Sequence, residues 1–274
     1  MVTRRPGPDP EPDQRSELEL LMAALRVETV AIAPAAIRAA ALGRAASAAT
    51  VCIDAVCLGA SLDDLYLQGR PADLGTDTAA ALAQLIATTA GDRLTDITID
   101  SLGFGLATVA DGAAPRGIDP ARAHGVSLRR TPIRDRPAAL ATLDAELQMT
   151  LHNWAGNDER QARGQVPINA LWLWGAGNKK PPTSTGLSLP FLVTDDLTLT
   201  AFWQLTGNAA KRVVDWREVI GAGDEAVIVP RDAADLSAII AAARRRSRWR
   251  SWRNPLTLYD TDFATLPLSE WQAP

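Results

Sequence analysis

The 274-residue chain has few of the side chains that most often carry chemistry or covalent cross-links. It contains two cysteines, Cys52 and Cys57, and two histidines, His124 and His152. The cysteines flank Asp54 in one apolar run, and in a strand they would point to opposite faces, so a disulfide between them is not expected. Two free thiols are typical of a protein of the reducing cytoplasm rather than of a secreted scaffold.

The sequence also lacks long apolar runs and a strong excess of one charge. No run approaches the roughly 18 apolar residues that a membrane span needs. The formal net charge is -4, which gives no reason to expect nucleic acid as the main partner. Residues 1–15 are rich in proline and charge, have no apolar core of a signal peptide, and are expected to be disordered. These features predict a cytoplasmic protein that is not bound to a membrane.

The common catalytic and metal-binding motifs are missing as well. Neither H-x-x-x-H nor H-E-x-x-H occurs, so no metal and no other cofactor is predicted. No G-x-S-x-G marks a serine nucleophile. The segment W-L-W-G-A-G-N-K-K places glycines and lysines after a strand, but it has neither of the usual phosphate-loop patterns. Two interpretations of this segment remain, an anion-binding turn and an ordinary tight turn at the end of a strand. The ordinary turn is favoured because short motifs often occur by chance.

Helix and strand patterns alternate along the chain, and 47% of the residues are hydrophobic. This alternation predicts an α/β fold: a single mixed α/β domain over residues 16–274, with a central sheet flanked by helices. Helices are expected to begin at Ser16, Pro34, Thr76, Pro137, Asn157, Asp196 and Asp232. Strands are expected at residues 50–58, 62–69, 166–174, 191–194, 226–230 and 256–259, and residues 97–109 are expected to form one bent strand or two.

One stretch, residues 136–177, concentrates the features that suggest a site. It contains a leucine stripe at helical spacing, formed by Leu140, Leu143, Leu147 and Leu151. Polar side chains follow at the edges of this stripe and beyond it, and polar groups that are buried must be paired. We therefore expect one polar pocket beside the strand that ends at Gly175. The residues expected to line it are Glu146, Gln148, His152, Asn157, Arg160, Asn169, Trp172, Trp174, Gly175 and Gly177.

The same stretch resembles the central motif of the RpfE-type regulatory proteins of proteobacteria. In that family, E-x-Q-M-L-L-H-x-H-P-V-N is followed by R-E-A-R-G and by P-V-N-S-x-W-x-W-G-G-G. A second segment, I-D-A-V-C-L-G-A-S-L-D-D-L-Y-L, resembles the family's A-D-P-V-H-L run and the short hairpin after it, so the likeness covers about residues 50–178. The matching positions of the central motif are Glu146, Gln148, Met149, His152, Asn157, Arg160, Gly164, Asn169, Trp172, Trp174, Gly175 and Gly177.

Proteins of this family are often described as phosphoglycerate mutase-like, because archaeal cofactor-independent phosphoglycerate mutases have a similar N-x-x-R…G…N…W-G-x-G run. Two departures from the family pattern bear on activity. Cys57 stands where the family has a histidine, and residues 154–157 read W-A-G-N where the family has H-P-V-N. The resemblance therefore implies a mutase-like regulatory or binding protein that lacks metal-dependent mutase activity.

The leading hypothesis is that Arg160, helped by Asn157, Asn169 and the main chain at the glycine turn, holds a small anion or a carboxylate of a protein partner. A guanidinium fork suits either ligand. An alternative is a phosphotransferase or phosphatase-like enzyme, with His152 as acid/base and Asp54 opposite it. A third is a subunit of a larger assembly that docks through the arginine- and tryptophan-rich residues 244–253, although these can also be the solvated end of the last helix.

Overall fold

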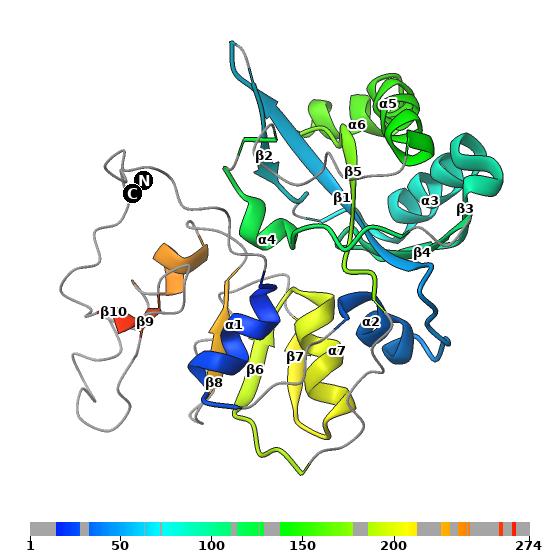
Figure 1. Cartoon of the computed structure of the whole chain (residues 1–274). Coiled ribbons are helices and arrows are strands. Elements are labelled where there is room, and N and C mark those ends of the chain that lie inside the picture. The colour runs from blue at the N-terminus through cyan, green and yellow to red at the C-terminus, as the bar shows by residue number, and fades with distance from the viewer. Residues whose placement is uncertain are drawn as a thin grey trace. The chain divides into compact units, whose positions relative to one another are not determined.

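The computed structural model describes residues 15–27, 33–62, 64–71, 73–110, 114–125, 127–128, 138–177, 186–212, 226–230, 235–239, 241, 258–259 and 265–266. Contacts group the chain into two compact units (Figure 1). Unit 1 comprises residues 1–11, 18–29 and 182–274, and unit 2 comprises residues 12–17 and 30–181. The expected disordered tail lies almost wholly outside the described residues, and the single domain over residues 16–274 stays a prediction. The fold class is confirmed, because the chain is a mixed α/β structure with antiparallel and parallel strands.

Unit 2 is built around one long strand, β1. Residues 50–54 of β1 pair with β4 and residues 52–56 pair with β5, both antiparallel, so β1 lies between the two. The end of β1 pairs with β2 as an antiparallel hairpin, and β3 pairs antiparallel with β4. The strands of this sheet are β1 (Thr50–Ala60), β2 (Leu65–Gly69), β3 (Leu94–Ile99), β4 (Phe104–Val109) and β5 (Ala170–Trp174).

One face of β1 supports the main apolar core. Val51, Ile53 and Ala55 alternate along the strand and pack with helices α3 (Thr76–Ala90) and α5 (Ala138–His152). Figure 1 shows both helices on the same side of the sheet. The predicted leucine stripe is confirmed, because its four side chains are all buried in this core: Leu140, Leu143, Leu147 and Leu151.

The opposite face of β1 is covered by α2 (Pro34–Ala41) and α4 (Pro120–Ala123). Cys52 and Val56 lie in a second apolar cluster there, together with both tryptophans of β5. Asp54 lies between them on the same face, because strand side chains alternate with a period of two. A buried carboxylate among apolar neighbours needs partners, and these are the starting point of the site described below.

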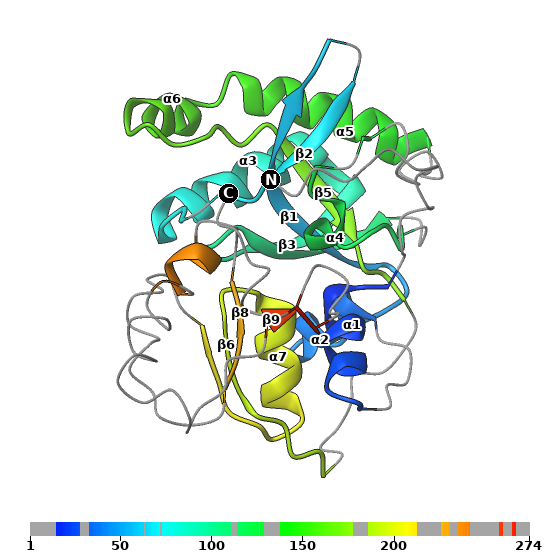
Figure 2. The same cartoon turned by 90° about the vertical axis from the view of Figure 1, so that its left-hand side faces the viewer.

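The β3–β4 segment settles a choice that the sequence left between one bent strand and two. The chain turns between the strands, and the Asp100 carboxylate accepts hydrogen bonds from the main-chain N–H groups of Leu102 and Phe104. Gly103 has a φ of +84°, a backbone conformation that favours glycine. Helix α6 (Ala155–Ala162) and the short helix η1 (Gly91–Arg93) complete unit 2. Figure 2 shows the β1–β2 hairpin projecting beyond the rest of this unit.

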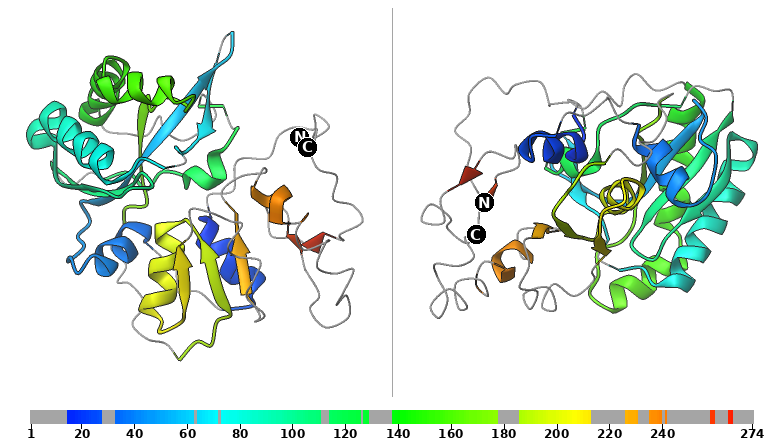
Figure 3. Two further views of the ribbon diagram at one scale, coloured as in Figure 1. Left: turned by 180° about the vertical axis from the view of Figure 1, so that it is seen from behind. Right: turned by 90° about the horizontal axis from the view of Figure 1, so that it is seen from below.

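Unit 1 contains a small parallel sheet in the order β7-β6-β8. Helix α7 connects β6 to β7, begins at the Asp196 cap as predicted, and packs beside these strands (Figure 3). The sequence patterns missed β7 and β10, which are only a few residues long. The elements are β6 (Phe191–Thr194), α7 (Leu197–Leu205), β7 (Ala210–Arg212), β8 (Ala226–Val229), β9 (Leu258–Tyr259), β10 (Thr265–Leu266) and most of α1 (Glu17–Ala24).

Two predictions from the composition concern disulfide bonds and membrane-spanning helices. Cys52 and Cys57 are both buried and unbridged, which confirms that they form no disulfide. In the part of the chain that the structure describes, no helix has both the length and the apolar character required to traverse a lipid bilayer.

Candidate functional site

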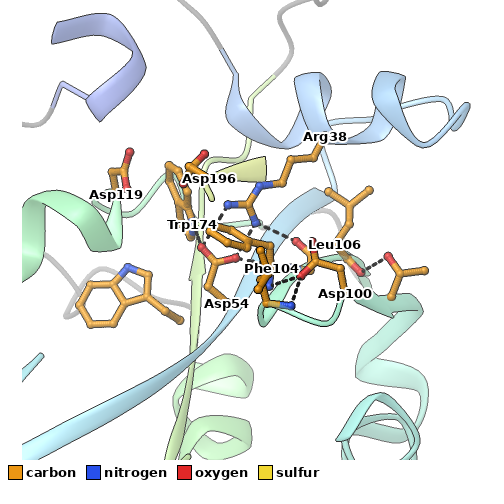
Figure 4. Close-up of polar contacts among 12 residues, drawn as sticks. Arg38, Asp54, Asp100, Phe104, Leu106, Asp119, Trp174 and Asp196 are labelled. Carbon is orange, nitrogen blue, oxygen red and sulfur yellow. Dashed lines mark hydrogen bonds and ion pairs between the residues drawn. The ribbon is translucent and has the colours of Figure 1, made fainter. Parts of the chain in front are cut away.

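Asp54 is held in a buried ion pair with Arg38 of α2. The two carboxylate oxygens lie 2.5 Å and 3.2 Å from the guanidinium nitrogens Nη1 and Nη2, and both side chains are 0% exposed. The indole N–H of Trp174 donates to the second oxygen at 2.8 Å, and the main-chain N–H of Gly105 approaches the first at 3.4 Å. Figure 4 shows the Arg38 side chain reaching from α2 to this carboxylate. Asp54 is therefore tied to α2, β4 and β5 at once.

The guanidinium of Arg38 has further contacts besides Asp54. It donates to the carbonyl oxygen of Gly105 at 3.0 Å and lies 5.2 Å and 5.3 Å from the ring centres of Phe104 and Trp174. Asp54 supplies a carboxylate that balances its charge. Sequence reasoning missed Arg38, although it is the one charged residue of α2. His152, the proposed acid/base partner of Asp54, is exposed at the end of α5 and does not contact this carboxylate.

Asn157 links the start of α6 to the chain before β5. Its amide nitrogen donates to the carbonyl oxygens of Leu151 and Ile168, both at 2.7 Å, and its amide oxygen accepts the Ile168 N–H at 2.8 Å. The side chain is 3% exposed. Every one of these bonds is made to main chain, so Asn157 works here as a clamp between two segments.

Asn169 extends the pairing of β1 in the same way. Its amide oxygen accepts the N–H of Leu58 at 2.7 Å, and its amide nitrogen donates to the Leu58 carbonyl at 2.8 Å. Its own N–H donates to the carbonyl of Val56. The side chain thus imitates one further residue of a strand beside β1, next to Cys57.

The polar residues on α5 face outward. Gln148 and His152 are exposed, and so is Met149. Glu146 forms an ion pair of 2.5 Å with Arg93 of η1, and this hydrogen bond lowers the pKa of the Glu146 carboxyl. The structure therefore places these α5 residues on the surface and Asn157, Asn169 and Arg160 below it.

The glycine turn after β5 is packed against other main chain. The N–H groups of Gly175 and Ala176 donate to the carbonyls of Arg116 and Pro115, and the Gly175 carbonyl accepts the N–H of Ala35. Gly175 has a φ of +75°, and a Cβ there would lie 3.0 Å from Pro34. Trp172 donates to the carbonyl of Ile118 at 2.7 Å. Two of the N–H groups that an anion cradle would need are thus already used, and Lys179 and Lys180 lie outside the described residues.

Arg160 is the buried cation of this region that lacks a carboxylate partner. It is 2% exposed, and the hydrogen bonds of its guanidinium to the described residues go to carbonyl oxygens: Nε donates to Val166 at 3.0 Å and Nη1 approaches Asp73 at 3.4 Å. Among the described residues no carboxylate lies within ion-pair distance of it. Burial lowers the pKa of Arg160. Carbonyl dipoles stabilise a buried cation only in part.

The neighbouring thiol does not neutralise Arg160. Burial raises the pKa of Cys57 from 9.0 to about 11, and the nearby Arg160 charge opposes this only in part. The thiol is therefore protonated and neutral at pH 7. In the folded protein, the positive charge of Arg160 thus coexists with a neutral sulfur.

This thiol should make the protein lose stability in alkali. The folded state keeps the Cys57 proton up to about pH 11, whereas the unfolded chain releases it near 9.0, so unfolding is favoured as the pH rises between these values. Each pH unit between the two pKa values is worth about 1.4 kcal/mol, which limits the loss to about 3 kcal/mol. Urea unfolding from pH 7.5 to 10.5 should show a shallower decline for Cys57→Ala than for the wild type. Equal slopes for the two proteins would contradict the assignment.

The chain does not offer a di-metal centre in the described residues. No group of three or more histidine, cysteine, aspartate or glutamate side chains is placed there to hold a metal ion. The donor set required by a metal-dependent mutase of the resembled type is therefore not met by this part of the chain.

Comparison with known proteins gives only distant likeness. No protein-family model matches the chain, and no curated protein matches it. The PH0037 protein from Pyrococcus horikoshii is 12% identical with a TM-score of 0.36, and the match covers 80% of this chain and 58% of that one. The cofactor-independent phosphoglycerate mutase from Thermoplasma acidophilum is 16% identical with a TM-score of 0.39, covering 85% of this chain and 69% of that one. We conclude nothing further from likeness at this level, and membership of the RpfE-type family stays a prediction.

Proposed function

We propose that this chain is a mutase-like regulatory protein that binds a small anionic ligand through Arg160 and carries out no metal-dependent mutase reaction. The mutase-like character rests on the motif resemblance over residues 50–178. The proposal of an anionic ligand rests on a single observation. The Arg160 guanidinium is buried and has no carboxylate partner in the described region.

The physical argument concerns the cost of burying charge. A guanidinium removed from water loses hydration that carbonyl oxygens replace only in part, and an anion replaces it more completely. Cys57, which is neutral at pH 7, does not supply this anion. The Asp73 carboxylate is exposed and already accepts the N–H of Gly75. An oxyanion that accepts two parallel N–H bonds would complete the arrangement, as in other arginine sites.

Access to Arg160 is through a surface turn. Arg163, Gly164 and Val166 follow α6 and are all exposed, and Gly164 adopts a φ of +71°. Short exposed turns open at low free-energy cost compared with core elements. Brief opening of this turn would admit a ligand to the guanidinium without unfolding the sheet.

The test is a matched pair of arginine variants titrated with inorganic phosphate. At a phosphate concentration of 100 times Kd, the wild type should gain about 2.7 kcal/mol in the free energy of unfolding. Arg160→Met should lose this gain. Arg163→Met, which removes an exposed charge three residues further on that acts on Arg160 only through space, should keep most of it.

The variants also separate specific binding from general salt effects. Phosphate stabilises many proteins by being excluded from their surface, and that effect should be the same in all three proteins. Thermal unfolding and urea unfolding at constant ionic strength would both report the difference. If the wild type and Arg160→Met respond equally to phosphate, Arg160 is a structural strut and the proposed function is wrong.

An assay for turnover distinguishes the proposed regulatory role from the enzymatic alternative. A panel of phosphate monoesters, phosphoglycerates included, should be bound without being hydrolysed or rearranged. Steady turnover that disappears in His152→Ala, with the fold intact, would favour the phosphotransferase alternative instead. The docking alternative through residues 244–253 concerns a segment outside the described residues.

A further inference from the structure

The turn that follows α6 contains a second unusual polar group, the side chain of Gln165. Its amide oxygen Oε1 is buried and has no hydrogen-bond partner among the described residues. A buried acceptor without a donor is costly, and native proteins contain few of them. Such an atom calls for a physical reason, and a ligand that brings a donor is one.

Gln165 and Arg160 belong to the same small piece of structure. The main-chain N–H of Gln165 donates to the carbonyl of Arg160 at 2.9 Å, and the Arg160 Nε donates to the carbonyl of Val166 at 3.0 Å. One main-chain hydrogen bond thus joins the two residues, and the Arg160 side chain bonds the residue that follows Gln165. This turn therefore combines a buried cation without an anion and a buried acceptor without a donor.

We propose that the ligand of this turn is a protonated oxyanion, whose charged oxygens accept from Arg160 and whose O–H donates to Oε1 of Gln165. The proposal rests on the anion-binding function proposed above and deepens it by naming the ligand class. At neutral pH, inorganic phosphate always carries at least one O–H, whereas sulfate has the same shape and no proton. Gln165 accordingly makes the site selective for a hydroxyl-bearing anion over a fully deprotonated one.

The experiment compares inorganic phosphate with sulfate on the full-length protein at pH 7 and constant ionic strength. Isothermal titration should give the wild type a Kd for phosphate about tenfold lower than its Kd for sulfate, the effect of one hydrogen bond to a charged ligand. Gln165→Met keeps a side chain of similar length and removes the acceptor. In this variant the two Kd values should become equal, with the sulfate value unchanged from that of the wild type.

A second variant gives an independent readout of the same contact. Gln165→Glu puts a negative charge into the same turn, and under the proposal this carboxylate would supply Arg160 with a counter-charge from within the chain. Binding of both anions should then weaken about tenfold or more, because the new carboxylate competes for the guanidinium and repels the ligand.

The outcomes distinguish this inference from the function on which it rests. If phosphate and sulfate bind the wild type with equal Kd, the role of Gln165 is wrong and anion binding at Arg160 stands. If neither anion binds the wild type more tightly than Arg160→Met, the proposed function itself fails. If Gln165→Met retains the tenfold preference for phosphate, a different acceptor recognises the proton and the inference is overturned.

Discussion

Replacing Asp54 with asparagine is expected to lower the free energy of unfolding by about 3–5 kcal/mol. Asparagine keeps the shape of the side chain and an acceptor for the Trp174 indole, but it removes the charge that faces Arg38. The guanidinium would then be a buried cation that has lost the carboxylate lying 2.5 Å from it. Urea unfolding followed by circular dichroism would measure the loss.

A double substitution is the control for this prediction. In Arg38→Met with Asp54→Leu, both charges are absent and apolar side chains fill similar volumes, so most of the lost stability should return. The Trp174 N–H and the Gly105 carbonyl each lose a partner in this variant, which leaves a deficit of about 1 kcal/mol for each of them. If Asp54→Asn alone costs less than about 1 kcal/mol, water reaches the pair and the two side chains are not fully buried as described above.

The ion pair also shows why one half of a buried cluster was visible in the sequence and the other half was not. Asp54 stands out because it interrupts an apolar strand. Arg38 belongs to an alanine-rich helix 16 residues earlier, where a single arginine is typical of a solvent-exposed position. That Arg38 is buried becomes visible only in the structure, where α2 packs on the sheet. There the nearby Ala35 and Ala39 lie in the apolar cluster. The signal that the sequence offered is a single charged residue in a helix that is otherwise apolar.

Local patterns were sufficient for most of the elements. The β-branched apolar run of β1 and the leucine spacing of α5 are properties of short segments, and both elements occur within two residues of their predicted bounds. The helix cap at Asp196 is a local signal as well. The two strands of unit 1 that were missed, β7 and β10, span too few residues for a periodic pattern to emerge.

The residues of the candidate site have hydrogen-bond partners outside their own helix or strand. The spacing of residues within one segment does not predict such partners. Asn169 bonds to Leu58, which is 111 residues away, and Asn157 bonds to main chain on both sides of it. The sequence marked both amides as polar groups near an apolar stripe, which is true of a clamp and of a pocket wall alike. The structure shows that both side-chain amides form their hydrogen bonds with main-chain groups. Arg160 differs from them because its charge is left without a carboxylate in the described region.

Asn157 offers the clearest way to separate these two roles. Asn157→Ala removes three buried hydrogen bonds to Leu151 and Ile168 and should lower the free energy of unfolding by about 3–4 kcal/mol. Asn169→Ala is the matched control, since it removes two bonds to Leu58 at a half-buried position and should cost about 1–2 kcal/mol. Urea unfolding with and without phosphate measures both quantities.

If Asn157 is a clamp and not a ligand group, the increment that phosphate adds to each variant should equal the increment in the wild type. Stability and anion binding would then fall on different residues, with Asn157 supporting α6 and Arg160 on α6 meeting the ligand. A phosphate increment that disappears in Asn157→Ala while Asn169→Ala retains it would place the amide in direct contact with the anion. In that case the pocket that the sequence predicted would include Asn157 after all.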